Sequence, residues 1–405
     1  MMFRSLDSAY ARMEAEIDRP VRGQETRLRN GAGFRTYPLD IGNGAFSNVF
    51  DVSFRPDQIR ASMSVYKDLI DIYDFARTSG HVVTSSAGFI YLADVSSGLP
   101  RQASLNLAIS RGRVRSLPVV DREAIVCRDG VLSTVQVDAV GELNLNGNVL
   151  TWAGSRTGRT AECYVYGNGN VIITHDTSLT TGSIRSLDED SRYTPMIEPD
   201  SDKIDIGFEA LENGEFLASG MSETGRIDLF KYDLVVRCEK PHYIMSGPNR
   251  AHIITIGPIK VDMAPESAVT AGPSLLTPNF SEHSINSDPS LGGKPPFTER
   301  RMARMVLYHT AGGLTHLRLY DGRPGSKIFT GLTPTEAYRA IDAEDEVVWG
   351  CFLDPGQTAK LCVSQDDSLN AYGNRHYLQW PSQVGDSYVW VPDRGRPTSS
   401  IISLH

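Results

Sequence analysis

Three carboxylates and two arginines lie beside glycine and small polar residues in the last quarter of the chain. The carboxylates are Asp321, Glu336 and Asp354, and the arginines are Arg304 and Arg323. A planar guanidinium binds a phosphate or a carboxylate through two parallel N–H groups, and a carboxyl group can move a proton. These residue types together favour cleavage of a bond to an anionic group.

Short glycine-containing segments adjoin these residues or apolar strands elsewhere. They read SSAGF (85–89), AGPSLL (271–276) and LDPGQTAKL (353–361). Glycine lets backbone amides approach a ligand closely, and loops at strand ends often carry binding residues. We therefore expect these segments to line one site.

Each candidate also has a purely structural interpretation. Asp354-Pro355-Gly356-Gln357 fits a type II turn, with proline at the second position and glycine at the third, although a turn can also point a carboxylate into a cleft. Glu336 is first a helix-capping residue. Asp321 and Arg323 are equally consistent with a solvated ion pair, and Arg304 lies in TERRMARM (298–305), where several arginines compete for the same role.

The order of these segments resembles the phosphodiester glycosidase family, which includes the enzyme that removes N-acetylglucosamine from a phosphodiester. The resemblance spans residues 45–365. It rests on residues matched one by one: Ala87, Gly88, Phe89, Gly272, Pro273, Leu275, Arg304, Asp321, Gly322, Arg323, Gly331, Thr333, Glu336, Leu353, Asp354 and Gly356.

The resemblance implies a catalytic role for Asp354, with Glu336 or Asp321 as its partner. It implies a substrate-binding surface that we expect to include Arg323, Arg304, Ser86, Gly88, Gly272, Gln357 and Thr358. Ser86 stands where the family usually has asparagine, and Pro355 and Gln357 stand where it has glycine. Because proline lacks an amide donor, the substrate or the reaction is expected to differ from the family's.

Other motifs fit poorly. Ser222 in SGMSETG lacks the G-x-S-x-G spacing of a nucleophile elbow. YGNGNV (166–171) precedes a β run and is typical of a hairpin turn. His309 and His316 have no obvious third metal ligand, so structural roles are favoured. We predict no metal and no cofactor.

Bulk composition narrows the class of protein. A net charge of −9 argues against broad nucleic-acid binding, and 40% hydrophobic residues are ordinary for a globular protein. We expect no membrane span and no signal peptide, because no apolar segment is long enough. Five scattered cysteines form no CxxC pair. We therefore expect a cytoplasmic protein, in a bacterial biosynthetic pathway, with a small anionic substrate and an oligomeric state that the sequence leaves open.

The pattern of elements predicts an α+β fold that is mixed but predominantly β-sheet, with a few flanking helices and long loops. Residues 1–45 are expected to form a helix and a polar lead-in, 46–365 the main domain, and 366–405 peripheral strands and a tail. We expect loops at 187–203 and 277–301.

Two helices have clear signals. One is expected within 62–80, because Val65, Leu69, Ile72 and Ala76 recur at helical spacing before Gly80. The other begins at Thr333, with proline next and glutamate at the third position.

Three functions remain open. The first is a hydrolase that cleaves a phosphodiester or glycosidic bond in a small phosphorylated or glycosylated metabolite. The second is a non-hydrolytic enzyme, performing elimination, cyclisation or group transfer in specialised metabolism, because fold does not fix chemistry. The third is a binding module without catalysis.

Overall fold

The computed structural model describes most of the chain between residue 18 and the C-terminus. The described residues are 18–89, 106–118, 121–157, 161–166, 170–174, 201–211, 214–223, 227, 232–239, 250–261, 264–276, 299–323, 326–366, 368–374, 377–382, 385–390 and 396–405.

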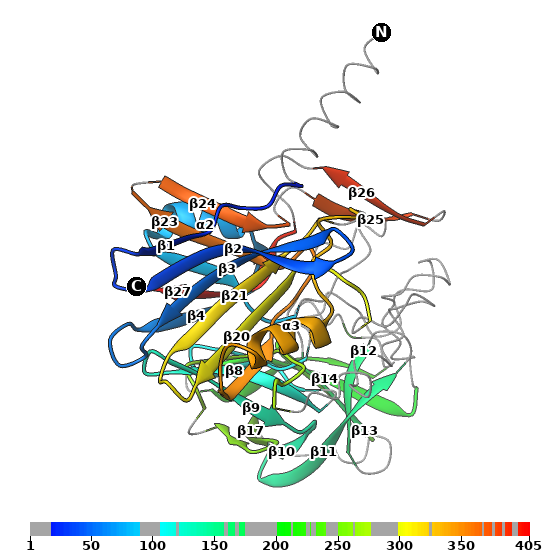
Figure 1. Ribbon diagram of the computed structural model, residues 1–405. Coiled ribbons are helices and arrows are strands. Elements are labelled where there is room, and N and C mark those ends of the chain that lie inside the picture. The colour runs from blue at the N-terminus through cyan, green and yellow to red at the C-terminus, as the bar shows by residue number, and fades with distance from the viewer. Residues whose placement is uncertain are drawn as a thin grey trace.

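A six-stranded sheet forms one wall of the upper half of the molecule (Figure 1). Its strands in spatial order are β1 (Gln24–Arg27), β2 (Gly33–Gly42), β3 (Ala45–Phe54), β21 (Thr315–Asp321), β20 (Arg304–Thr310) and β22 (Val347–Phe352). β3 and β21 are therefore hydrogen-bonded neighbours, although more than half of the chain separates them in sequence. That pairing brings the N-terminal strands beside the predicted catalytic segments.

A second sheet of five strands belongs to the same half. In spatial order they are β24 (Ser368–Gly373), β23 (Lys360–Gln365), β5 (Val83–Ser86), β27 (Thr398–Leu404) and β4 (Ala61–Ile70). Buried side chains from both sheets share one hydrophobic core, for example Val52, Leu319, Leu361 and Ile402. Removal of this apolar surface from water is the main force that holds the sheets together.

A third sheet joins this half to the rest of the chain. Its strands are β7 (Arg113–Ser116), β6 (Ala108–Ser110), β19 (Ser267–Thr270), β8 (Arg122–Arg128) and β9 (Val131–Val137). Ile125 and Val269 pack into the main core, whereas Ile109 and Ala268 pack into a second core. The third sheet therefore contributes side chains to both.

The second core belongs to a sheet of nine strands in the lower half of Figure 1. They are β10 (Val140–Leu145), β11 (Asn148–Thr157), β12 (Ala161–Tyr166), β13 (Asn170–Thr174), β16 (Leu234–Glu239), β14 (Lys203–Ala210), β15 (Phe216–Ser222), β17 (Arg250–Ile256) and β18 (Ile259–Lys260). Because β10 pairs with both β11 and β17, this sheet curls back on itself. A separate hairpin is formed by β25 (Tyr377–Ser382) and β26 (Gly385–Trp390).

Two helices occur among the described residues, α2 (Ile72–Ser79) and α3 (Pro334–Asp342). The start of α3 confirms the predicted cap, because Thr333 and Glu336 form a capping box with proline in the first turn. Ala337 and Ile341 pack on Val306 and Tyr320 of the six-stranded sheet. Gly80 ends α2 in a left-handed conformation, as expected.

The predicted α+β class is wrong, because the protein has a β-rich fold with several sheets and a half-barrel. Within the described chain, every pairing between named strands is antiparallel, so the sheets are also not mixed. The helix expected within 62–80 forms only over the second half of that range, as α2. Residues 61–70 form β4, in which Met63 and Val65 are buried and β27 supplies the hydrogen-bonding partner.

The predicted boundaries divide elements that pair in space. The lead-in contributes β1 and β2 to the first sheet, and the C-terminal tail contributes β27, which is buried along its length inside the second sheet. Residues 1–17 and most of the predicted loops at 187–203 and 277–301 lie outside the described residues. No helix in the described part of the chain is long and apolar enough to cross a bilayer.

Candidate functional site

The glycine-rich segments predicted to line one site contact one another just after the ends of β5, β19 and β22. The Asp354 amide donates to the Ala87 carbonyl at 3.0 Å. The Gly272 amide donates to the Phe352 carbonyl at 2.7 Å, and the Phe89 amide donates to the Thr270 carbonyl at 3.2 Å. The segments 86–89, 270–273 and 352–354 therefore lie side by side.

The remaining segments join the same region through Gly356. Its amide donates to the Ala303 carbonyl at 2.8 Å, and its carbonyl accepts from Nδ2 of Asn374 at 2.8 Å. Gly331 has a φ of 70°, and a Cβ there would collide with the Met302 carbonyl. Only glycine allows this approach without strain. We name these contacting segments (86–89, 270–273, 302–304, 321–323, 331 and 353–360) the strand-end cluster.

Asp321 lies at the end of β21, where two backbone amides bind its carboxyl group. Oδ1 accepts from the Gly322 amide at 2.8 Å, and Oδ2 accepts from the Gly373 amide at 3.3 Å. Burial raises the pKa of Asp321 to about 6, although the two amides act in the opposite direction. A carboxyl group that titrates near pH 6 can both donate and accept a proton close to neutrality.

The turn that follows Asp354 is buried and unusually polar. Asp354 is 8% exposed, Gln357 4% and Thr358 1%. Within the described chain, neither the amide nitrogen nor the amide oxygen of Gln357 has a hydrogen-bond partner, and Oγ1 of Thr358 has none. Such a buried group costs about 1–3 kcal/mol, and most buried polar groups in proteins are paired. A polar molecule bound at this turn would therefore supply hydrogen-bond partners to Gln357 and Thr358.

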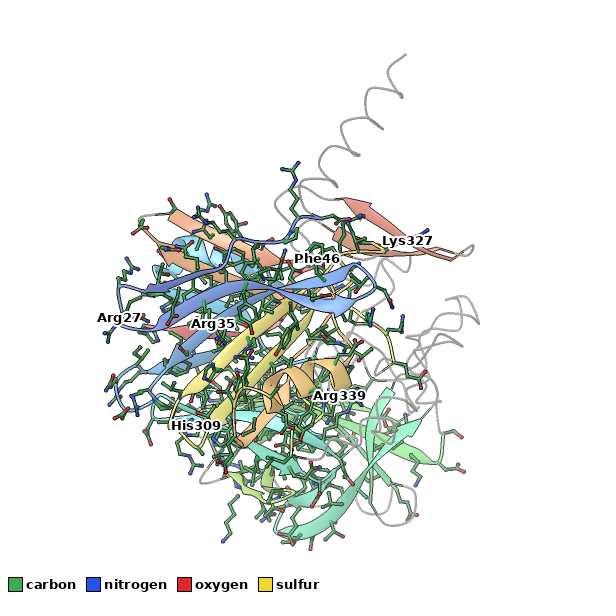
Figure 2. All side chains as sticks on the ribbon, viewed as in Figure 1. Arg27, Arg35, Phe46, His309, Lys327 and Arg339 are labelled. Atoms are coloured by element: carbon green, nitrogen blue, oxygen red, sulfur yellow. The ribbon has the colours of Figure 1, made fainter. Side chains whose placement is uncertain are left out.

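Arg323 holds a carboxylate of the chain itself. Its Nε and Nη2 donate to Oδ1 and Oδ2 of Asp18 at 2.6 and 2.5 Å, and Oγ of Ser326 donates to Oδ2 at 2.9 Å. Arg323 was predicted to bind an anionic group of the substrate; in this structure its guanidinium binds Asp18 instead. The turn that carries Ser326 lies against the start of β3, where the Phe46 amide donates to the Ile328 carbonyl at 2.7 Å; Figure 2 shows Phe46 and Lys327 at this end of the sheet.

Arg304 ties together neighbouring main-chain segments. It is 1% exposed, its Nε donates to the Leu332 carbonyl at 3.0 Å, and its Nη2 donates to the Arg300 carbonyl at 2.7 Å. Burial, helped by the charge of Arg300, lowers its pKa to about 9. These carbonyl contacts position the cluster, because they fix the start of β20 against the residue before the cap of α3.

Glu336 is engaged at the start of α3. Oε2 accepts from the Thr333 amide at 2.9 Å, and Oε1 accepts from Nη2 of Arg301 at 2.6 Å. Burial raises the pKa of Glu336, but the hydrogen bonds from Arg301 and Thr333 outweigh it, and the net shift is downward. A carboxylate held ionised in this way is a poor proton donor.

Ser86 contributes its side-chain hydroxyl to the cluster, and Gly88 and Gly272 contribute backbone amides. The Lys360 amide donates to Oγ of Ser86 at 3.2 Å, and the Gly88 amide donates to Oγ of Ser400 at 2.9 Å. A Cβ on Gly88 would lie 2.7 Å from that of Val269, so a larger residue does not fit. Gly272 precedes Pro273 through a cis peptide bond.

Several residues at the cluster were not predicted from the sequence. Asp18, Ser400, Gly373 and Asn374 come from the lead-in and the tail. No local motif marks them, because their role depends on the pairing of distant strands. Among the described residues, no group of three or more histidine, cysteine or acidic side chains is placed to hold a metal ion.

Comparison with known proteins defines the fold alone. No family model matches the chain, and no curated protein sequence matches it. A hypothetical protein from Synechocystis has a similar structure, with a TM-score of 0.56, 15% identity and 95% of this chain covered; this chain spans only 64% of that protein. A putative exported protein from Burkholderia pseudomallei matches with a TM-score of 0.54 and 15% identity, over 89% of this chain and 74% of that one.

A third structure is less similar. It is the catalytic domain of zebrafish N-acetylglucosamine-1-phosphodiester alpha-N-acetylglucosaminidase, auto-inhibited by its pro-peptide. The TM-score is 0.39 at 12% identity, over 95% of this chain and 81% of that chain.

Proposed function

We propose that this protein is an enzyme whose reaction centre is the strand-end cluster, and that it hydrolyses a glycosidic or phosphodiester bond in a small anionic metabolite. One observation carries the proposal. Segments that are far apart in the sequence, and that were selected for their chemistry, contact one another around Asp321, Asp354 and the buried turn at Gln357. The ordered resemblance to phosphodiester glycosidases supports the reaction class.

In this proposal Asp321 is the general acid and base. Its pKa of about 6 gives both protonation states near neutral pH, which a group that first donates and then accepts a proton requires. Asp354 is the second carboxylate, which stabilises positive charge as the bond to the leaving group breaks. Gln357 and Thr358 supply hydrogen bonds to the substrate, since their polar atoms have no partner within the described chain.

Arg323 binds the anionic group of the substrate in exchange for Asp18. The fork already holds a carboxylate through two N–H donors, and a phosphate oxygen pair presents the same geometry. Because Asp18 and the substrate compete for one guanidinium, Asp18→Asn is expected to lower KM while leaving kcat almost unchanged.

Two other functions have specific support. The replacement of family glycines by Pro355 and Gln357 favours a non-hydrolytic step at the same cluster, since it removes an amide donor and adds a side chain. The pairing of Arg323 with Asp18 is also compatible with a binding module, in which a ligand anion displaces Asp18 and no bond is cleaved. Turnover in heavy-oxygen water separates these: hydrolysis places the label in product, a non-hydrolytic step gives unlabelled product, and a binding module gives none.

The test is a turnover assay of wild type and variants on nucleotide sugars and sugar 1-phosphodiesters, with products followed by mass spectrometry. Asp321→Asn and Asp354→Asn are each expected to lower turnover by about 100-fold or more, the contribution of a positioned acid or base. Asp57→Asn is the matched control, because Asp57 is exposed and follows the end of β3 that lies opposite the end paired with Asp321. The proposal is wrong if no substrate is turned over, or if both cluster variants keep full activity.

A further inference from the structure

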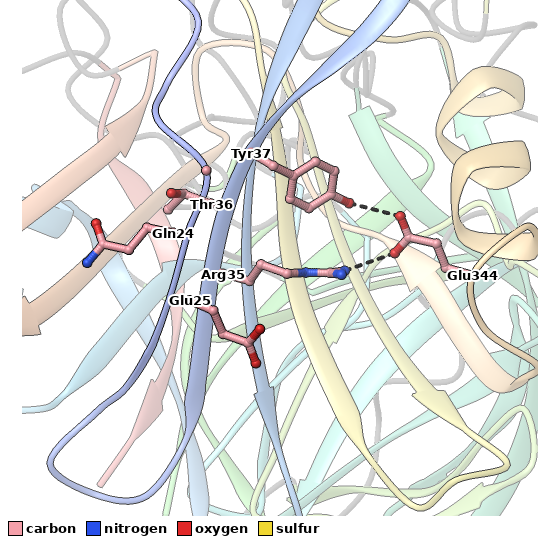
Figure 3. Close-up of a pocket in the computed structure, with 7 residues that line it drawn as sticks. Gln24, Glu25, Arg35, Thr36, Tyr37 and Glu344 are labelled. Carbon is pink, nitrogen blue, oxygen red and sulfur yellow. Dashed lines mark hydrogen bonds and ion pairs between the residues drawn. The ribbon is translucent and has the colours of Figure 1, made fainter.

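An open pocket of about 400 Å³ lies on the outer part of the six-stranded sheet (Figure 3). It is formed by β1, by β2 and by Glu344, which lies just after α3. Its lining residues are Gly23, Gln24, Glu25, Arg35, Thr36, Tyr37 and Glu344. Apart from the glycine, every lining residue carries a polar group. None of them belongs to the strand-end cluster, so this pocket is separate from the proposed reaction centre.

Glu344 and Tyr37 hold the guanidinium group of Arg35 in place. Nη2 of Arg35 donates to Oε2 of Glu344 at 2.9 Å, and its guanidinium lies 4.8 Å from the ring centre of Tyr37. The Tyr37 hydroxyl donates to Oε1 of the same glutamate at 3.1 Å, as Figure 3 shows. Arg35 therefore presents its remaining N–H groups in a fixed orientation, which reduces the entropy that binding would cost.

The supporting glutamate is itself anchored by a buried arginine. Nη2 of Arg318, which is fully buried, lies 3.1 Å from Oε2 of Glu344 and 3.1 Å from Oδ2 of Asp51. Because buried ion pairs contribute little to net stability compared with apolar packing, stability alone does not account for this one. An arginine that fixes Glu344, which in turn fixes Arg35, is the kind of support that a preorganised binding site requires.

The lining groups that remain available are both donors and acceptors. Within the described chain, the side chains of Gln24 and Glu25 make no hydrogen bond, and neither Nε nor Nη1 of Arg35 makes one. The pocket thus offers an amide, a carboxylate and one edge of a guanidinium. Vicinal hydroxyl groups, each of which donates and accepts, complement such a set.

Charge argues against an ionic ligand. An anion would approach a region in which carboxylates outnumber arginines, the carboxylates being Glu25, Glu344, Asp51 and Asp345 and the arginines Arg35 and Arg318. A cation would meet the guanidinium of Arg35, which is 42% exposed in the pocket. A neutral, polyhydroxylated ligand avoids both penalties.

We propose that the pocket lined by Gln24, Glu25 and Arg35 binds a neutral saccharide, either a free oligosaccharide or part of a larger glycan. This inference does not depend on the proposed reaction. Because the pocket is open and few groups contact the ligand, the affinity is expected to be in the millimolar range.

The test is saturable binding of three neutral trisaccharides, maltotriose, cellotriose and laminaritriose, measured by ligand-observed NMR on the full chain. At least one is expected to bind, and the double variant Gln24→Ala/Glu25→Ala to weaken it by about tenfold or more, which corresponds to the loss of one or two hydrogen bonds. Both side chains are exposed and make no hydrogen bond to any described residue, so the described fold does not depend on them. Arg35→Lys, which keeps the charge and loses the fork, is expected to weaken binding similarly.

The matched control is Asp57→Ala/Gln58→Ala, an acidic and amide pair exposed elsewhere. It is expected to leave binding unchanged. The proposal is overturned if none of the trisaccharides binds at a concentration of about 10 mM, which is well above the expected dissociation constant. It is also overturned if the pocket variants bind as wild type does. Binding of glucosamine or inorganic phosphate in place of the neutral sugars would also overturn it, because either result assigns an ionic ligand.

Discussion

The titration of Asp321 makes the folding stability depend on pH, and the substitution Asp321→Asn is expected to remove this contribution. Burial raises the pKa of this carboxyl from 3.8 to about 6 in the folded protein. The folded state therefore favours the protonated form. Its stabilising effect is complete below pH 3.8 and is lost as the pH rises through 6.

The magnitude follows from the two pKa values. One pKa unit corresponds to about 1.4 kcal/mol, so the full effect of Asp321 is about 3 kcal/mol. About 2 kcal/mol of this falls between pH 4 and pH 8. Asparagine cannot titrate, but it keeps one oxygen to accept from the Gly322 amide. Between pH 4 and pH 8 the wild type is therefore expected to lose about 2 kcal/mol of unfolding free energy relative to Asp321→Asn.

The assay is denaturant unfolding of both proteins at several pH values between about 4 and 8, a range set by the two pKa values. Comparison with Asp57→Asn, at an exposed position, removes effects of overall charge. Parallel stability curves for wild type and Asp321→Asn would refute the reasoning, because they would mean that the carboxyl titrates at the same pH in both states. It would then also be unsuited to the acid–base role proposed for it.

Three substitutions test other parts of the structure by thermal or denaturant unfolding. Gln357→Met replaces a buried amide that has no hydrogen-bond partner among the described residues by an apolar chain. It is expected to gain about 1–3 kcal/mol, so a clear loss contradicts it. Arg318→Met leaves Asp51 buried without its main cation and is expected to cost about 3–5 kcal/mol, whereas adding Asp51→Asn should recover part of that cost. Gly331→Ala, at a positive φ and against a main-chain carbonyl, is expected to cost about 2–4 kcal/mol. Gly44→Ala has a similar φ with no neighbour nearby and should cost about half as much; equal losses would show that crowding is unimportant.

Local signals in the sequence predicted local structure well. Thr333 and Glu336 form the expected capping box, because that motif involves only neighbouring residues. The apolar run at 347–352 is a strand, as expected. In contrast, the spacing around Val65 fits a helix and a strand alike, and pairing with β27 from the far end of the chain decided the outcome.

The candidate site was only partly predictable for the same reason. The segments around Ala87 and Asp354 contact each other as their shared chemistry suggested. The partner of Arg323 was not predictable, because Asp18 lies 305 residues away and no motif surrounds it. The amide from Gly373 that binds Asp321 likewise comes from a strand of the second sheet.

The most direct test of the proposed reaction centre is a crystal structure of the protein grown with a sugar 1-phosphate. We expect its phosphate on Arg323 in place of Asp18, and its sugar within hydrogen-bonding distance of Gln357 and the two carboxylates Asp321 and Asp354. A sugar phosphate bound elsewhere, with Asp18 still on Arg323 and no ligand at the buried turn, would contradict the assignment of the strand-end cluster as the site of chemistry.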